Sequence, residues 1–170
     1  MHLTLADLMQ YTEWERSRWV EVFRKHPKAL EINIGPNRDE RFNTVGDWVR
    51  HIFAAEIRYV ERLSGRPLTD VAGMRNDNAE ELFEFGRRTR NELKHFLETF
   101  PAPEWDIPRE LQILSFLVKA TPNKIAVHVV MHEIRHWAQI ATLLRLNGIN
   151  DEFGHDFLGS PVMGGDWRRI

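Results

Sequence analysis

Apolar residues recur every three to four positions along four long segments of the chain, which is the spacing of one buried face of an α-helix. The four segments predicted in this way are 4–25, 44–63, 78–100 and 121–146. Proline or glycine follows each of them closely, at Pro27, Gly65, Pro101 and Gly148. Because these residue types are common just beyond helix ends, we expect four separate helices that pack together.

Residues at the starts of two helices support this prediction. Thr44 and Asp47 have the spacing of a capping box, with aspartate in place of the usual glutamate. Thr121 is a good N-cap and is followed by Pro122, a residue favoured at the first helical position. The sequence therefore predicts an all-α fold, a four-helix bundle, and bundle cores often hold metal sites.

Other stretches lack helical spacing. Residues 33–38 are typical of a loop. Residues 107–120 are densely apolar, and we expect a short extended segment there, two strands between the third and fourth helices. Residues 151–170 are rich in glycine and predict an irregular C-terminal tail over the body of the protein. Nothing marks a linker, so we expect residues 1–170 to form a single domain.

Composition excludes several classes of function. The chain has 170 residues, no cysteine, and 23 basic against 25 acidic residues, with a formal net charge of -2. Disulfides, thiolate metal ligands and a cysteine nucleophile are therefore excluded. The balanced charge predicts no nucleic-acid partner, and the basic run 87–90, surrounded by glutamates, is expected on a solvated helix face. With no signal-peptide pattern and no membrane-length apolar stretch, we expect a soluble cytoplasmic protein.

The strongest chemical signal is the segment 132–136, His-Glu-Ile-Arg-His, inside the last predicted helix. Residues four apart on a helix differ by about 40° around its axis, so His132 and His136 can bind one metal ion. His51, on the inward stripe of the second helix, is the expected third donor. His128 extends the column, but about 12 Å separates it from His136 along the helix. We therefore expect a structural or supporting role for His128.

The same segment matches the His-Glu-x-x-His pattern of zinc proteases, in which the glutamate is the general base. The longer protease pattern requires glycine and histidine where this chain has Gln139 and Thr142, and Glu152 lies beyond the helix. Glu133 also points about 100° away from His132 and can face a neighbouring helix instead. We expect no protease activity, and Glu133 is only a candidate catalytic residue.

Two further polar positions are candidates. Gln139, one turn after His136, either orients a ligand or water, or is a polar residue at a helix interface. His155 and the adjacent aspartate either fold over the mouth of the site, where they can transfer a proton, or form a turn packed by residues 157–158. We favour the turn. The six tryptophans are expected mostly in the core, with some at a homodimer interface.

Together these features resemble the DinB family of bacterial metal-binding four-helix bundles. The resemblance covers the helix order, the segment 48–52 around His51, and residues 132–148. It implies a metal site formed by His51, His132 and His136. Many members carry His-His-Arg-Gly-Gln at the end of the motif, whereas residues 135–139 here read Arg-His-Trp-Ala-Gln, which keeps the ligand and the glutamine.

The better understood members of that family are thiol-dependent transferases and isomerases that use bacillithiol or mycothiol. The resemblance thus implies one divalent transition metal as cofactor and metal-dependent chemistry on a small molecule, with a low-molecular-weight thiol as partner. Three imidazoles suit Zn, Ni, Fe and Cu alike, and we expect Zn or Ni first. The alternative is a non-enzymatic metal- or ligand-binding protein related to stress.

Overall fold

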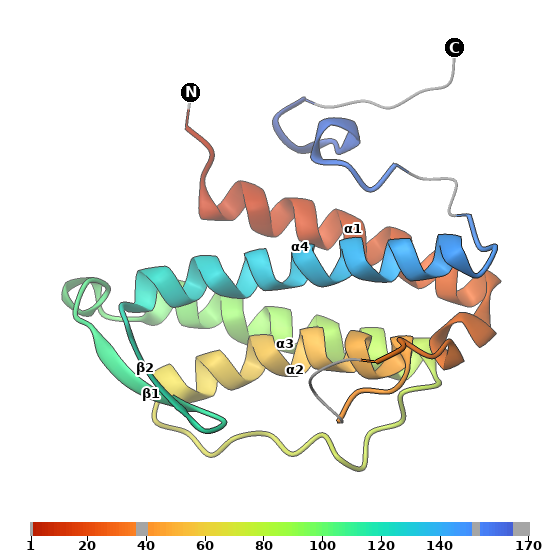
Figure 1. Cartoon of the computed structure of the whole chain (residues 1–170). Helices are drawn as coiled ribbons and strands as arrows, with labels where there is room; N and C mark the ends of the chain where they lie inside the picture. Colours follow the sequence, from red (N-terminus) through yellow and green to blue (C-terminus); the bar gives the residue numbers. More distant parts are fainter. Residues whose placement is uncertain (1, 37–40, 151–153, 165–170) are drawn as a thin grey trace.

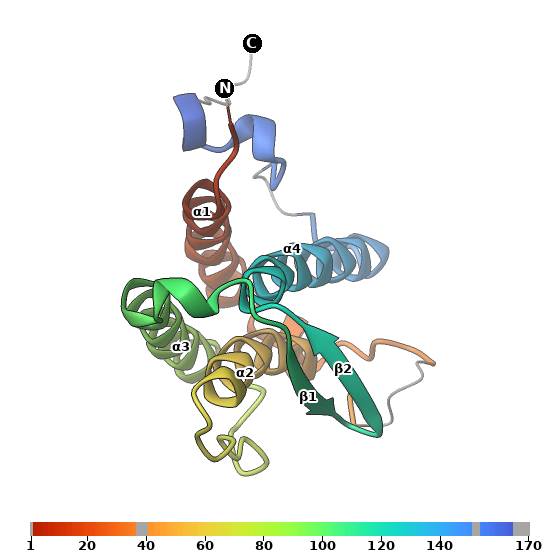
Figure 2. The same ribbon diagram turned by 90° about the vertical axis from the view of Figure 1, so that its left-hand side faces the viewer.

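The structure is a computed structural model that describes residues 2–36, 41–150 and 154–164. Four long helices dominate it: α1 (Leu5–Lys25), α2 (Val45–Leu63), α3 (Ala79–Thr99) and α4 (Pro122–Leu146). They lie side by side as a bundle (Figure 1), which confirms the all-α prediction. Seen end-on, the order around the bundle is α1, α3, α2, α4, so that α2 lies beside α4 (Figure 2).

Short polar motifs fix where the helices begin. In the predicted capping box, Oγ1 of Thr44 accepts a hydrogen bond from the backbone N–H of Asp47 at 3.2 Å, and Oδ2 of Asp47 accepts one from the backbone of Thr44 at 3.1 Å. Thr4 and Asp7 form a second capping box at the start of α1, which the sequence analysis did not identify. Thr121 caps α4 as expected. These caps satisfy backbone N–H groups that a helix start leaves without partners.

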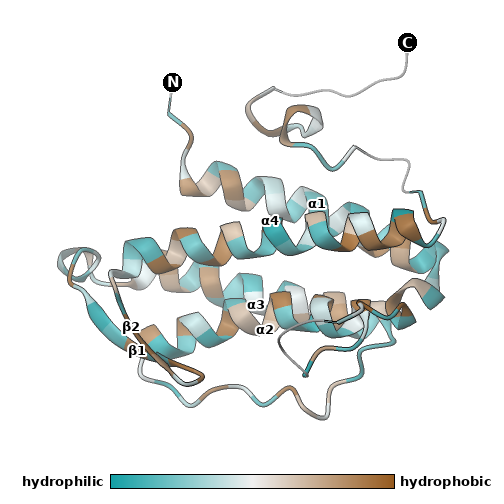
Figure 3. Ribbon diagram, viewed as in Figure 1, coloured by the Kyte–Doolittle hydropathy of each residue, from teal (hydrophilic) through white to brown (hydrophobic). Residues whose placement is uncertain are grey.

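The extended segment between α3 and α4 is a β-hairpin, as predicted. Strand β1 (Arg109–Ile113) pairs antiparallel with β2 (Phe116–Ala120). The hairpin lies beside α2 and α4 at one end of the bundle (Figure 2). Leu111 is buried, whereas Phe116 and Leu117 are 67% and 69% exposed, and the hairpin tip is visibly hydrophobic in Figure 3.

Aromatic side chains form the centre of the bundle. Trp19 of α1 and Trp137 of α4 are completely buried, and their rings stack with centroids 5.3 Å apart. Trp14 and Trp48 are partly buried and pack against the same apolar cluster. These four tryptophans therefore belong to the core or its margin, as predicted.

The prediction that residues 87–90 lie on a solvated helix face is right for Arg87 and wrong for Arg90. Arg87 is exposed and pairs with Glu84, whereas Arg90 is only 3% exposed. Four consecutive helical residues cover about 300° of the helix circumference, so a run of this length cannot lie wholly on one face. Thr89 and Arg90 are the members that point into the bundle.

The C-terminal tail contains two short 3-10 helices, Phe157–Gly159 and Val162–Gly164, and is otherwise irregular. Its described part lies against α1, where the hydroxyl of Tyr11 donates to the backbone oxygen of His155 at 2.6 Å. The ring of Phe157 packs edge-on against Tyr11, but Leu158 is 75% exposed. The favoured interpretation of a packed turn is therefore confirmed for Phe157 and wrong for Leu158. None of the helices described here is long and apolar enough to cross a membrane.

Candidate metal centre

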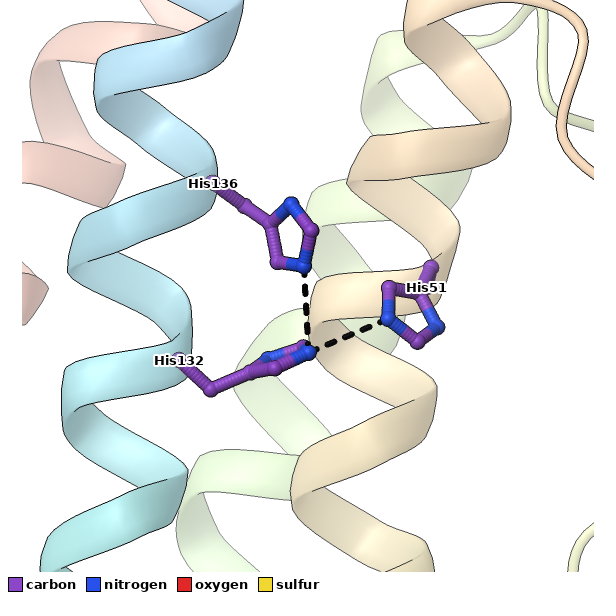
Figure 4. Close-up of side chains that lie close together, drawn as sticks. All are labelled: His51, His132 and His136. Carbon is purple, nitrogen blue, oxygen red and sulfur yellow. Dashed lines mark hydrogen bonds between the residues drawn. The ribbon is translucent and has the colours of Figure 1, made fainter. Parts of the chain in front are cut away.

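Three histidines meet between α2 and α4. His51 comes from the second turn of α2, and His132 and His136 come from successive turns of α4 (Figure 4). The Nε2 atom of His132 lies 3.1 Å from Nε2 of His51 and 3.1 Å from Nε2 of His136. One ring nitrogen from each residue can be chosen so that all lie within 4.8 Å of one another. The structure thus brings together the three histidines that the sequence predicted.

Hydrogen bonding alone does not explain this arrangement. A ring nitrogen carries either one proton or one lone pair, so Nε2 of His132 can form only one good hydrogen bond, although two nitrogens approach it. Two nitrogens about 2.0–2.1 Å from one zinc ion lie about 2.9 Å apart at a right angle and about 3.4 Å apart at the tetrahedral angle. The observed 3.1 Å falls between these values, so the spacing of His132 from each of its two neighbours fits a shared ion.

Burial keeps neutral the two histidines that α4 contributes to the group, His132 and His136. It lowers the pKa of His132 to about 2, and the neighbouring His136 and His51 act in the same direction. Burial also lowers the pKa of His136 to about 4, with a further contribution from the positive charge of Arg135, while Gln139 opposes the shift. At neutral pH both imidazoles therefore have a lone pair available, which is the form that binds a metal.

Aromatic side chains form the walls of the site. The ring of Phe42 lies 4.6 Å from that of His51, and the ring of Trp48 lies 5.8 Å from that of His136. His132 is 9% exposed, whereas His51 and His136 are only partly buried. The group therefore lies at the edge of the bundle, with two of its three members within reach of solvent.

Glu133 does not face the histidines. Both of its carboxylate oxygens accept hydrogen bonds from Arg16, at 2.6 and 2.7 Å. Arg90 donates a further one at 2.7 Å, and the indole N–H of Trp137 another at 3.0 Å. Glu133 is 2% exposed, and its contacts lie in the core. This is the alternative in which Glu133 faces neighbouring helices, and it gives the carboxylate no place beside a metal-bound water.

The same two arginines bind a second buried carboxylate, on α2. Glu56 accepts from Arg16 at 3.0 Å, from Arg90 at 2.7 Å and from the hydroxyl of Thr89 at 2.6 Å. Two positive and two negative charges therefore compensate each other inside the bundle. The sequence analysis missed this network. The sequence contained one indication of the network: the polar residue Thr89 lies on the apolar stripe of the third predicted helix, and Arg90 directly follows it.

Two further candidates, Gln139 and His128, lie on α4 next to the histidine group. Gln139 is exposed on α4, one turn after His136. The ring of His128 lies 5.8 Å from that of His132 and 5.4 Å from that of Tyr59, outside the three-histidine group.

The structure places His155 beside α1. Its Nδ1 atom lies 3.9 Å from Oε1 of Glu15, and its ring lies 5.9 Å from that of Trp19. In the described part of the tail, this contradicts the interpretation in which His155 covers the mouth of the site. Glu152, considered above for a protease, lies outside the described residues, as does the end of the predicted loop at 37–38.

Fold and site together define a class: a four-helix bundle whose second and fourth helices supply a histidine group able to hold a metal ion. Comparison with protein families narrows this class further. The DinB family model matches residues 1–156, a range that contains all three histidines, and the chain belongs to the DinB family. Among curated proteins the search found no match.

Proposed function

We propose that His51, His132 and His136 bind one divalent transition metal ion. The observation that carries this proposal is the approach of two imidazole nitrogens to the same Nε2 atom of His132, each at 3.1 Å. Membership of a metal-binding family supports it. An all-imidazole donor set favours Zn or Ni, with Fe and Cu as further candidates.

We further propose that the protein carries out metal-dependent chemistry on a small molecule, of the thiol-dependent transferase or isomerase type. Three neutral imidazoles leave a tetrahedral ion one donor short. A bound divalent metal would act as a Lewis acid at that position and lower the pKa of a thiol or water. Partial exposure of His51 and His136 supports access by a small molecule. The rings of Phe42 and Trp48 would exclude water where they lie against His51 and His136.

Elemental analysis of the purified protein tests the metal proposal. Wild type should contain about one equivalent of metal per chain, and His51→Ala, His132→Ala and His136→Ala should each lose most of it. His128→Ala is the matched control, because it removes an imidazole from the same column of α4 without touching the group. Full metal content in the three variants, or loss of metal only in His128→Ala, would contradict the assignment.

Visible spectroscopy of the cobalt-substituted protein tests the enzymatic proposal against its alternative. The alternative is a non-enzymatic metal- or ligand-binding protein. Thiols such as 2-mercaptoethanol, or azide, should change its visible spectrum if a coordination position is open. An unchanged spectrum at saturating concentration would mean a closed site and would favour the alternative.

We also propose that the protein is a homodimer, with the hairpin in the interface. Leu114, Phe116 and Leu117 of the hairpin are 60%, 67% and 69% exposed, an unusual number of large apolar side chains for one region. Light scattering after gel filtration tests this proposal. Wild type should have the mass of a dimer, and the double variant Phe116→Ser, Leu117→Ser that of a monomer. A monomeric wild type would overturn it.

A further inference from the structure

An apolar cavity of about 220 Å³ lies between the hairpin, α2 and α4. Aliphatic side chains from both strands and from α4 form most of its lining, and two aromatic side chains complete it: Leu111, Ile113, Val118, Ile125, Tyr59 and His128. Among the described residues that line the cavity, Lys124 alone belongs to the Lys, Arg, Asp and Glu types, and it is exposed to solvent. A cavity of about 150 Å³ with such a lining is enough to bind benzene, so this one has room for a benzyl-sized group.

The cavity is adjacent to the three-histidine group. His128 forms part of its wall and lies one turn before His132 on α4, a rise of about 6 Å. The two rings are 5.8 Å apart. On α2, His51, Ala55 and Tyr59 occupy successive turns of one stripe, so that only the small residue Ala55 separates His51 of the group from Tyr59 of the cavity along that stripe.

We infer that this cavity binds the apolar part of the substrate, while a donor atom of the same molecule lies at the three histidines. The part of this inference that concerns the metal rests on the proposed function. What it adds is the class of substrate, an amphiphilic small molecule with an aryl or short alkyl group. A concave apolar pocket with a few polar groups at one end is the usual form of a small-molecule site. Here the polar end is His128, beside the histidine group.

Thiol titrations of the cobalt-loaded protein test this inference. 2-Phenylethanethiol carries a phenyl group at a length suited to the cavity, whereas 2-mercaptoethanol presents the same thiol without it. The phenyl thiol should bind at least about tenfold more tightly, as burial of an apolar group predicts. Equal affinity of the two thiols in wild type would overturn the inference.

Two variants on the same strand test whether the cavity causes the preference for the phenyl thiol. Val118→Trp puts a large side chain into the cavity and should abolish the tenfold preference, whereas Lys119→Trp points away from the cavity and should keep it. If Val118→Trp does not fold, Ala120→Phe narrows the same cavity and replaces it. A preference that survives in the folded cavity-filling variant would place the phenyl group elsewhere and overturn the inference.

A measurement without metal separates this inference from the metal proposal. Benzyl alcohol should shift the methyl NMR signals of Leu111, Ile113 and Val118 in metal-free protein, in a saturable way that Val118→Trp abolishes. If cobalt does not bind but these shifts occur, the metal proposal fails while the apolar site stands. If cobalt binds thiols but benzyl alcohol shifts none of these signals, the inference fails and the metal proposal stands.

Discussion

Glu56 of α2 and Glu133 of α4 are bound by the same two arginine side chains, Arg16 of α1 and Arg90 of α3. Glu133 directly follows His132, and the turn of about 100° between them sends the carboxylate into the core while the imidazole faces α2. The charge network therefore restrains the rotation of both helices that carry the histidines.

Replacing Arg90 should destabilise the protein strongly. Arg90→Met leaves two buried carboxylates each with one cationic partner fewer, and breaking such a pair costs about 3–5 kcal/mol. Urea denaturation measures the change in the free energy of unfolding. Arg87→Met is the matched control on the same helix, because its ion pair with Glu84 is exposed, is screened by water and should contribute little. Similar losses in the two variants would refute a special role for the buried network.

Gly46 should not tolerate even a methyl group. A Cβ atom at this position of α2 would lie 1.8 Å from the backbone oxygen of Asn76, which cannot move like a flexible side chain. Gly46→Ala should therefore lower the melting temperature by several degrees or prevent folding. Gly73→Ala has nothing within 4 Å of the new atom and should change the melting temperature little. Thermal unfolding followed by circular dichroism compares the two.

The sequence predicted the helices because their signals are local. Each observed boundary lies within one residue of its predicted position, since periodicity and capping residues such as Thr44 and Thr121 act over one or two turns. The histidine group was predictable for a similar reason: helical spacing joins His132 to His136, and only His51 had to come from another helix.

The buried charges and the place of the tail were not predictable in this way. Whether Arg90 faces solvent or the core depends on how α3 packs against α1 and α2, and its position next to Thr89 on the apolar stripe does not decide between the two. The tail has no periodicity, and a contact such as that between Tyr11 and His155 joins residues 144 positions apart. Such long-range choices follow from the packing of the whole bundle.

Glu15 should make stability fall as pH rises. Glu15 of α1 is 1% exposed, and burial, reinforced by the negative charge of Glu133, raises its pKa to about 9 from an ordinary value of 4.5. The folded protein therefore keeps a proton that the unfolded chain releases above about pH 4.5. This contribution to stability is complete below about pH 4.5 and is lost progressively up to about pH 9. Tyr11 and His155 are the other titratable groups facing it, and Asp156 acts on Tyr11.

Glu15→Gln removes that titration. The variant should gain free energy of unfolding relative to wild type as pH rises between about pH 5 and pH 9, and the difference should level off above it. Urea denaturation across this range measures the difference. Glu21→Gln, on the exposed side of the same helix, is the control and should keep the wild-type decrease of stability with pH, because it retains Glu15. A constant difference between Glu15→Gln and wild type would mean that Glu15 is charged in the folded protein at neutral pH.

Glu133→Gln should distinguish this protein from a zinc protease. The glutamine preserves shape but weakens the charge-assisted hydrogen bonds to Arg16 and Arg90, so we expect a loss of stability of about 2–5 kcal/mol. Folded Glu133→Gln protein should nevertheless keep its full metal content, because the carboxylate makes its contacts in the core and not with His132 or His136. Wild type should cleave no more of a broad peptide library than the variant does. Elemental analysis and mass spectrometry of the library provide the two measurements, and peptide cleavage by wild type that this substitution abolishes would restore Glu133 as a catalytic base.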